Sequence, residues 1–337
     1  MEYLEEVLKR DPQAAGAHYP LALAYTGLGE PAKAEAHLRQ RREHEILPAD
    51  PLMVELDELL QSPQTYETLG IRALDRQDWT EAAAQFRKGL ALDPNHPGLL
   101  HRLGTTLYMM GDAAGARDLF EHAVRVSPEH ARAHYSLGVL AASDGRHEEA
   151  IAHFTDALRH EPNYAEARLR LAASLRRTRR PGESLAHYEQ VLAANPANAD
   201  ARLAHAMALV QLRRYADARD RLRAAMEAYP DQTVFAHGLA RLLAAAPDDR
   251  VRDGQEALTL VQTLLRADER TPDVGETMAM ALAELGRYDE AVAVQRDLVA
   301  GGERAGRQDI VERLAANLRL YERGAPCRTP WTDAEMP

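Results

Sequence analysis

Apolar and polar positions alternate along the chain in the manner typical of amphipathic helices. Apolar residues recur three and four positions apart within each segment, and short polar turns separate the segments. A proline closes every second segment, at Pro94, Pro128, Pro162, Pro196 and Pro230, so that each interval is 34 residues. A fixed period of this length predicts an array of stacked helix pairs in place of a single globular core.

Further residue types keep the same register and suggest how the helices pack. The repeated positions are Leu69, Leu103, Leu137 and Leu171; Gly70, Gly104 and Gly138; Ala82, Ala116 and Ala150; and Phe86, Phe120, Phe154 and Tyr188. Each glycine is expected where the two helices of a pair cross, with the alanine facing it, because small residues allow a close approach. The aromatic residue is expected to fill the space between successive pairs. The proline is expected to end the second helix, because it lacks an amide donor.

The segment LGIRALDRQDWTEAAAQFRKGLALDP, residues 69–94, carries all of these features. It resembles the tetratricopeptide repeat family, whose units combine a Leu-Gly step, a small alanine, an aromatic residue and a closing proline. The resemblance implies an all-α fold, a right-handed superhelical α-solenoid in which the first helix of each pair lines a concave groove. Only three of the 41 basic residues are lysine, which indicates an arginine-preferring genome and hence a bacterial protein.

The register divides the chain into segments of unequal regularity. We expect a half repeat at 1–14, a degenerate unit plus a linking helix at 15–62, five regular units at 63–232, two divergent units at 233–303, a capping helix at 304–324 and an extended tail at 325–337. The linking helix is the apolar segment PLMVELDELL. Because the first segment matches only the second half of a repeat, the sequence indicates a fragment of a longer protein.

The last residues, APCRTPWTDAEMP, contain three prolines and no helical period, which is why an extended tail is predicted there. Trp331 lies in this tail, and a large apolar ring normally packs against another surface. We expect the tail either to dock onto a neighbouring copy or the chain's own groove, or to be mobile. Cys327 is the lone cysteine and has no partner for an internal disulfide.

Charge and hydropathy narrow the classes of partner. The formal net charge of −11 opposes general affinity for nucleic acid, whose binders carry a basic footprint. No run of eighteen apolar residues occurs and the first residues are charged throughout, so neither a membrane span nor a signal peptide is predicted. We expect a soluble protein in the cytoplasm, or in the periplasm if an upstream signal has been removed.

Signatures of catalysis and metal binding do not occur in the sequence. There is no glycine-rich phosphate loop and no nucleophile elbow, and the segments HEEAI at His147 and HEILP at His44 lack the second histidine of a zinc-protease motif. His37, His153 and His187 share one helix position but are separated by whole repeats, which predicts surface histidines. The carboxylates are expected on solvated helix faces. We therefore predict a protein that is not an enzyme and has no catalytic, cofactor or metal site.

The concave groove is the expected binding surface, because equivalent positions of successive first helices line it. The candidate groove residues are His101, Arg102, Tyr108, Tyr135, Arg170, Arg176, Arg177, Met207, His237 and Arg241. Arginine, histidine and tyrosine suit an acidic or extended peptide, because they offer bidentate donors, stacking surfaces and hydroxyls. The alternative is that the arginines between Arg168 and Arg180 form a solvated face balanced by glutamates.

Chaperone-binding relatives hold a carboxylate with asparagines on their first helices, and this feature does not transfer. The asparagines Asn95, Asn163, Asn195 and Asn198 fall in expected turns, and Asn317 falls in the capping helix.

The sequence favours a non-catalytic scaffold that binds a protein or peptide segment in the groove. Two alternatives remain open: the repeat portion of a larger multidomain enzyme or cytochrome-associated protein, such as a repeat-fused glycosyltransferase, and a self-assembling homo-oligomer, because a half repeat leaves an apolar face uncovered. Binding of RNA is disfavoured by the acidic charge and by the absence of a repeated pair of base-reading residues.

Overall fold

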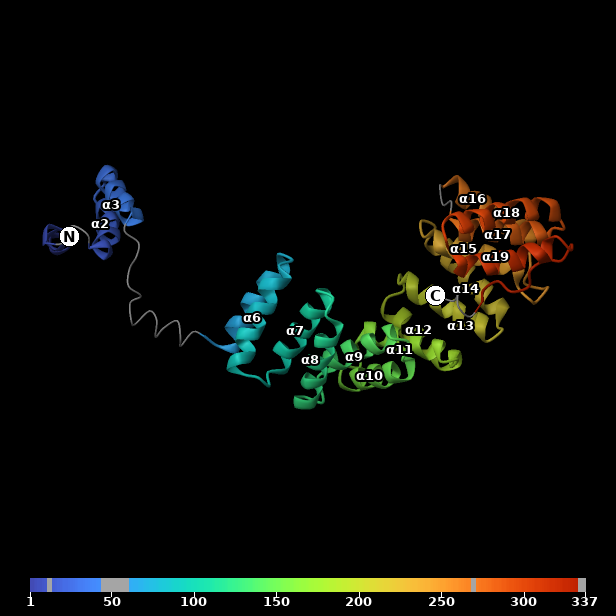
Figure 1. Ribbon diagram of the computed structural model, residues 1–337, viewed down its shortest axis with the longest axis horizontal. Helices are drawn as coiled ribbons and strands as arrows, with labels where there is room; N and C mark the ends of the chain where they lie inside the picture. The colour runs from blue at the N-terminus through green and yellow to red at the C-terminus, as the bar shows by residue number, and fades with distance from the viewer. Residues whose placement is uncertain (11–13, 44–60, 268–270, 333–337) are drawn as a thin grey trace. The chain divides into compact units, whose positions relative to one another are not determined.

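The computed structural model describes residues 1–10, 14–43, 61–267 and 271–332, and the regular elements in these ranges are all α-helices (Figure 1). This confirms the predicted all-α solenoid class. The segment PLMVELDELL, expected as a linking helix, lies outside the described residues. The chain divides into two compact units, residues 1–94 and 95–337.

The first unit holds five described helices. They are α1 (Glu2–Arg10), α2 (Ala15–Gly27), α3 (Pro31–Glu43), α5 (Pro63–Asp75) and α6 (Trp79–Leu92). α2 packs against α3, and α5 packs against α6, so each forms an antiparallel pair joined by a short turn. Ser62 caps the start of α5 because its hydroxyl accepts a hydrogen bond from the Thr65 amide at 3.1 Å.

The second unit continues the array with thirteen described helices. They are α7 (Pro97–Met109), α8 (Ala113–Val126), α9 (Ala131–Ser143), α10 (His147–His160), α11 (Ala165–Arg177), α12 (Pro181–Ala194), α13 (Ala199–Gln211), α14 (Tyr215–Ala228), α15 (Thr233–Ala245), α16 (Gly254–Arg266), α17 (Pro272–Glu284), α18 (Tyr288–Arg304) and α19 (Gln308–Tyr321). Each odd-numbered helix up to α17 packs against the even-numbered helix that follows it, and the odd-numbered helices also contact one another in sequence. We call the surface formed by α7, α9, α11, α13, α15 and α17 the inner surface.

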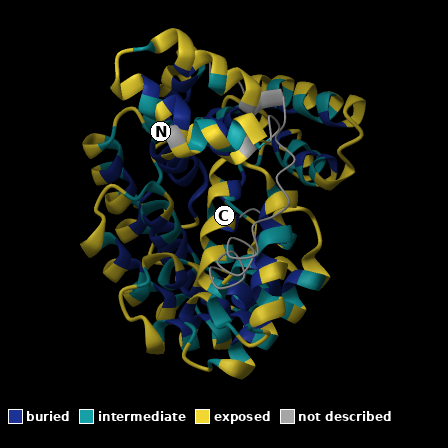
Figure 2. Cartoon of the chain, turned by 90° about the vertical axis from the view of Figure 1, so that its left-hand side faces the viewer, coloured by how far each residue is buried: buried dark blue, intermediate teal, exposed yellow. Residues whose placement is uncertain are grey.

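Buried positions follow the helix sides that face other helices, while the turns are exposed (Figure 2). Within the second unit the largest apolar cluster extends from α13 to the C-terminal segment and includes Phe235, Leu239, Met280 and Tyr321. α19 packs on α18 and buries Leu314 and Tyr321. The C-terminal helices therefore share one core, whereas earlier pairs bury smaller clusters between neighbours.

The repeated glycines face aromatic rings of their own pair. A Cβ atom added at Gly104 in α7 would lie 2.6 Å from Cε1 of Phe120 in α8, and Gly138 stands in the same relation to Phe154. The group nearest to each glycine is thus the aromatic ring, which lies directly over the glycine backbone, a contact that the sequence analysis did not predict. The same ring also reaches the next pair, since Phe154 shares a buried cluster with Leu171 and Leu175 of α11.

Replacing Gly104 with alanine is expected to lower the free energy of unfolding by roughly 1–3 kcal/mol, because the new methyl group overlaps the Phe120 ring. Urea denaturation of the two proteins measures this difference. Gly182 in α12 is the matched control, because a Cβ there has no atom within 4 Å, and its replacement by alanine should not destabilise the protein. Adding Phe120→Leu to the Gly104→Ala variant should restore part of the loss.

The turn inside each regular pair places one residue in the left-handed region. Gly111 and Gly145 adopt φ values of 90° and 76°, and Gln77 adopts 60° at the equivalent position. In the next two pairs the residue is Arg179, with a φ of 61°, and then Arg213, with 57°. Glycine adopts this conformation without steric cost, while a residue with a Cβ is disfavoured there. Two consecutive pairs thus carry arginine where glycine fits better.

Candidate binding surface

The upstream half of the inner surface, on α7 and α9, is partly open. Tyr108 is 41% exposed near the end of α7, while His101 and Tyr135 are half-buried between neighbouring helices. Nε2 of His101 lies 3.2 Å from Oγ of Ser136, and the Tyr135 ring lies 4.9 Å from that of Tyr164, centroid to centroid. These side chains form a mixed polar and aromatic surface.

The other predicted groove residues on α7 and α11 have different surroundings. Arg102 is half-buried, and Arg170 and Arg177 are exposed. Arg176 is only 2% exposed, so the alternative that it belongs to a solvated helix face was wrong. That alternative does describe Arg180, whose guanidinium donates to both carboxylate oxygens of Glu183 at 2.7 Å.

The downstream half of the inner surface, from α13 to α17, is covered. Met207 and Arg241 occupy the same position of successive first helices and are 0% and 3% exposed, and Met280 of α17 is also buried. His237 is half-buried, and its Nε2 lies 3.0 Å from Oγ1 of Thr277. Burial lowers the pKa of His237 below its usual value. Met207 and Arg241 are therefore not open groove positions.

The C-terminal segment 325–332 covers Arg241. Nε of Arg241 donates a hydrogen bond to the carbonyl of Pro330, which is itself buried, and the Arg241 guanidinium lies 6.0 Å from the centre of the Trp331 ring. Trp331 packs against the apolar cluster that contains Met207 and Met280. Of the three possibilities for this ring, docking on the chain's own groove describes its position in the structure.

The lone cysteine also belongs to this docked segment. Cys327 is 4% exposed, and burial raises the pKa of its thiol. Further anchoring comes from Arg328, which forms an ion pair with Glu284 of α17. Glu284 in turn pairs with Arg252 at 2.9 Å. The segment is thus held by apolar burial and by charged contacts together.

A buried carboxylate lies beneath the segment. Glu276 of α17 is 0% exposed, and its Oε2 lies 3.1 Å from Nη2 of Arg241 and 3.1 Å from Nη1 of Arg313. Its Oε1 accepts a hydrogen bond from Nδ2 of Asn317 in α19 at 3.0 Å. The expectation that carboxylates lie on solvated faces was wrong here. Sequence reasoning missed this cluster because Arg313 and Asn317 come from a helix outside the repeat register.

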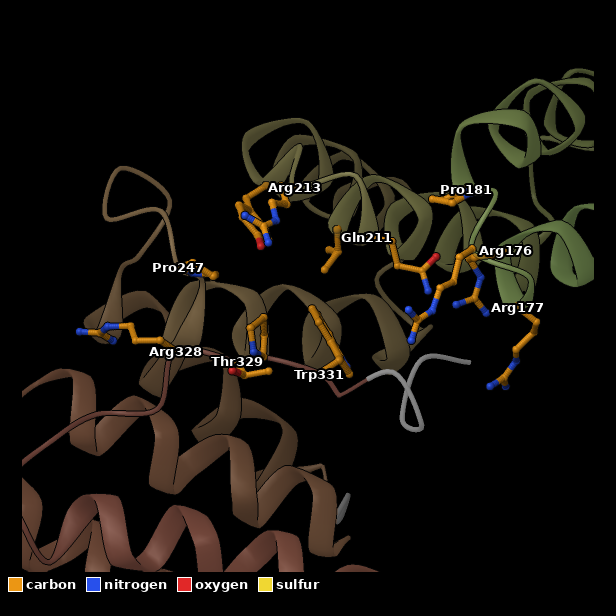
Figure 3. Close-up of a pocket in the computed structure, with 13 residues that line it drawn as sticks. Arg176, Arg177, Pro181, Gln211, Arg213, Pro247, Arg328, Thr329 and Trp331 are labelled. Carbon is orange, nitrogen blue, oxygen red and sulfur yellow. The ribbon is translucent and has the colours of Figure 1, made fainter.

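The arginines at the ends of α11 and α13 surround a hollow of about 670 Å³ in the second unit (Figure 3). We call it the arginine hollow. None of the described residues that line it is an aspartate or glutamate, and five of them are arginines: Arg176, Arg177, Arg179, Arg213 and Arg328. Thr329, Pro330 and Trp331 of the C-terminal segment form one of its walls, as Figure 3 shows for Thr329 and Trp331. Three parts of the chain thus meet around one basic hollow.

Several histidines pair across the two helices of a unit, which the search along single helix positions missed. Nδ1 of His18 lies 3.0 Å from Nδ1 of His37, and Nδ1 of His134 lies 3.4 Å from Nδ1 of His153. His18 and His134 are buried, whereas His37 and His153, which were predicted at the surface, are half-buried. Their signal in the sequence is a separation of 19 residues in both pairs.

Within the described ranges no group of three or more histidine, cysteine, aspartate or glutamate side chains could hold a metal ion. No helix in the described part of the chain is long and apolar enough to cross a membrane.

Comparison with known proteins identifies related folds. A stretch of 64 residues is 42% identical to part of the probable biofilm formation methyltransferase WspC of Pseudomonas putida, covering 19% of this chain and 15% of that protein. A tetratricopeptide repeat protein from Parabacteroides merdae is similar in structure with a TM-score of 0.56, at 17% identity over 77% of this chain and 99% of that one. PilF of Pseudomonas aeruginosa is similar with a TM-score of 0.53, at 20% identity over 64% of this chain and 96% of that one.

Family models extend this similarity along the sequence. One model described as tetratricopeptide repeat matches residues 2–44, 67–120, 101–165 and 145–199, and a second with the same description matches residues 175–242. The first alone matches more than half of the chain. Together with the helix pairs and their 34-residue period, these matches show that the chain belongs to the tetratricopeptide repeat family.

Proposed function

We propose that the protein is a non-catalytic scaffold that binds a protein or peptide segment along the inner surface of residues 95–337. The tetratricopeptide repeats support a role in protein interaction in general. The observation that carries the proposal is the change along the inner surface, which is partly open at Tyr108 and Tyr135, basic at the arginine hollow and covered from α13 onward. The accessible part thus runs from α7 to the hollow.

The side chains on this accessible part suit an extended segment. Aromatic rings at Tyr108 and Tyr135 offer stacking surfaces, and Arg177 offers donors for carboxylates. Repetition of equivalent positions on successive helices gives contacts at regular spacing along a chain. Affinity in such an interface depends on a few anchors within a wide contact area.

The proposal is tested by affinity capture from cells of the source organism with quantitative mass spectrometry. The double variant Tyr108→Ala/Arg177→Glu changes two exposed positions on the inner surface, and Arg125→Glu changes an exposed position on α8, a second helix. We expect the wild type and the Arg125→Glu control to capture the same set of proteins in equal amounts. The double variant should recover at least about fivefold less of these proteins. Equal recovery by all three proteins would exclude this surface.

A second candidate function is that of the repeat portion of a larger enzyme. The observation that favours it is the 42% identity to 64 residues of a protein named a methyltransferase. A catalytic domain encoded in the same reading frame as this chain would support the candidate. A reading frame with repeats alone would remove it.

A further inference from the structure

Arg176 is a buried cation without a full set of hydrogen bonds. It lines the arginine hollow, is 2% exposed, and its Nε and Nη1 atoms have no hydrogen-bond partner among the described residues. The hydroxyl of Tyr188 is nearby, and it too has no partner of hydrogen-bond geometry in that part of the chain. Burial lowers the pKa of Arg176, an effect that Tyr188 only partly offsets. A guanidinium in this state is unfavourable unless an anion or acceptor completes its contacts.

The neighbouring charges do not neutralise Arg176. Within the described residues neither Arg177 nor Arg213 has a carboxylate within ion-pair distance, whereas Arg328 pairs with Glu284. Gln211 also lines the hollow, and its buried Oε1 is an acceptor without a partner among the described residues. An amide carries no charge, so Gln211 does not compensate the charge of Arg176. Among the described residues the lining of the hollow thus holds an excess of positive charge, in a protein whose net charge is −11.

Two of the arginines occupy backbone positions that favour glycine. Arg179 and Arg213 have left-handed φ values of 61° and 57°, where the preceding two pairs have Gly111 and Gly145. Both line the hollow. A side chain at such a position lowers stability relative to glycine, and unfavourable backbone conformations of this kind concentrate at functional sites.

We propose that the arginine hollow binds an anionic group of a protein segment, a phosphorylated side chain or a cluster of carboxylates, with Arg176 as its buried anchor. This deepens the proposed scaffold function and rests on it. Arginine forms paired, charge-assisted hydrogen bonds with both kinds of oxyanion. The Trp331 ring in the wall of the hollow gives an apolar surface beside the anion. A protein segment is favoured over nucleic acid because the rest of the acidic chain repels a polyphosphate backbone.

The test measures fluorescence anisotropy of three labelled probes with the full chain. The probes are an octaglutamate peptide, a peptide with one phosphoserine in a neutral sequence, and its unphosphorylated form. We expect at least one anionic probe to bind. If the natural ligand group is a phosphate, the unphosphorylated peptide should bind at least tenfold more weakly than its phosphorylated form. If the natural ligand group is a cluster of carboxylates, octaglutamate should bind most tightly of the three probes.

The variants assign the binding to the hollow. Arg176→Leu should weaken binding of the preferred probe at least tenfold, and Arg176→Lys should retain part of the affinity because it keeps a charge. The stability of Arg176→Leu separates a binding role of Arg176 from a structural role. If Arg176 is an uncompensated buried cation, its removal should leave the urea midpoint unchanged or raise it. Each variant is also measured in a background that carries both Asp333→Asn and Glu335→Gln. This background removes two carboxylates of the chain itself, which follow the residues of the hollow wall in the sequence.

Glycine substitutions give a second, independent readout. Arg179→Gly and Arg213→Gly should each raise the ratio of folded to unfolded protein about fivefold while weakening probe binding about two- to fivefold. The matched control is Gln77→Gly, which removes the same backbone strain at a position that does not line the hollow. It should raise the ratio equally and leave probe binding unchanged.

Two results would overturn the inference. The first is equal probe affinity in wild type and Arg176→Leu, whatever happens to the urea midpoint. The second is arginine-dependent binding of a labelled single-stranded DNA that is tighter than binding of either anionic peptide of equal charge. The outcome is separable from the scaffold proposal. If cellular partners are still captured by Arg176→Leu, the scaffold proposal stands and the anion site is excluded. If the probes bind but capture of cellular partners does not depend on the inner surface, the anion site stands and the scaffold proposal is excluded.

Discussion

Replacing Glu276 with alanine is expected to lower the free energy of unfolding by roughly 3–5 kcal/mol. The substitution removes the carboxylate that lies between the guanidinium groups of Arg241, which is 3% exposed, and Arg313. Arg241 would then lose the carboxylate oxygen that lies 3.1 Å from its Nη2, in a buried place where water cannot replace the contact. Arg313 keeps Asp273, whose Oδ1 lies 3.9 Å from its Nη2. The amide of Asn317 would also lose its acceptor.

The C-terminal segment reports this change directly. Because Arg241 also donates to the Pro330 carbonyl and lies under the Trp331 ring, release of Arg241 should release the segment. In a Trp79→Phe background, Trp331 is the remaining tryptophan, and its emission should shift to the red in the Glu276→Ala variant. Urea denaturation followed by the Trp331 emission measures both the release of the C-terminal segment and the loss in free energy of unfolding.

A paired substitution controls for simple loss of volume. The double variant Arg241→Met/Glu276→Met removes an anion and a cation together and fills the space with apolar atoms, so it should recover more than half of the stability lost in Glu276→Ala. Arg313 is 19% exposed in its side chain and can turn toward solvent. A loss below about 1 kcal/mol in Glu276→Ala would show that the cluster contributes little.

Acidification is expected to destabilise the second unit through His101. Burial lowers the pKa of His101 to about 4, and the nearby charges of His130, Arg102 and Arg132 act in the same direction. The ring also packs 5.5 Å from Phe120 and lies beside the Ser136 hydroxyl, and neither group can neutralise an imidazolium. The folded protein therefore resists protonation of this side chain.

The sign of the pH dependence follows from this lowered pKa. Above pH 7 the imidazole is neutral in both states, so it contributes no pH-dependent term. As the pH falls below about 6.5, the unfolded chain binds the proton first, and stability is lost progressively until the folded pKa near 4 is reached. The full effect of this one side chain is about 3 kcal/mol.

The prediction is checked by urea denaturation at pH 7 and at pH 4.5. The His101→Gln variant should lose clearly less stability on acidification than the wild type, because glutamine can still bond to Ser136 but does not titrate. His122→Gln is the control, since His122 lies on α8 and bonds to Asn95 at 2.9 Å. Equal losses in wild type and His101→Gln would contradict the assignment.

Much of the fold followed from local features of the sequence. The glycine, aromatic and proline positions at intervals of 34 residues predicted stacked helix pairs, and the family match supports the same reading. Such repeats are predictable because each pair packs mainly against its neighbours, so the pattern within one unit contains most of the packing information. The side chain that packs against each glycine could not be predicted in this way. Alanine and the aromatic residue both recur with the same period, so the period alone does not show which of them contacts the glycine.

Most of the candidate site required the tertiary structure. Arg176 and Arg177 are adjacent in the sequence and look alike there, yet one is buried and the other is exposed, and their side chains point in different directions (Figure 3). The contact between Arg241 and Pro330 joins residues 89 positions apart. No repeat register relates these two positions, so the covering of the downstream groove was not predictable.

The amino-acid sequence by itself determined the all-α class, the 34-residue period and the family, since these depend on short-range spacing of small, aromatic and proline residues. The tertiary structure alone decided which groove positions are open, where the C-terminal segment lies, and which charges are buried together. The physical reason is that exposure and ion pairing depend on elements brought together from distant parts of the chain, such as Arg241, Glu276 and Arg313, whereas helix formation depends on near neighbours.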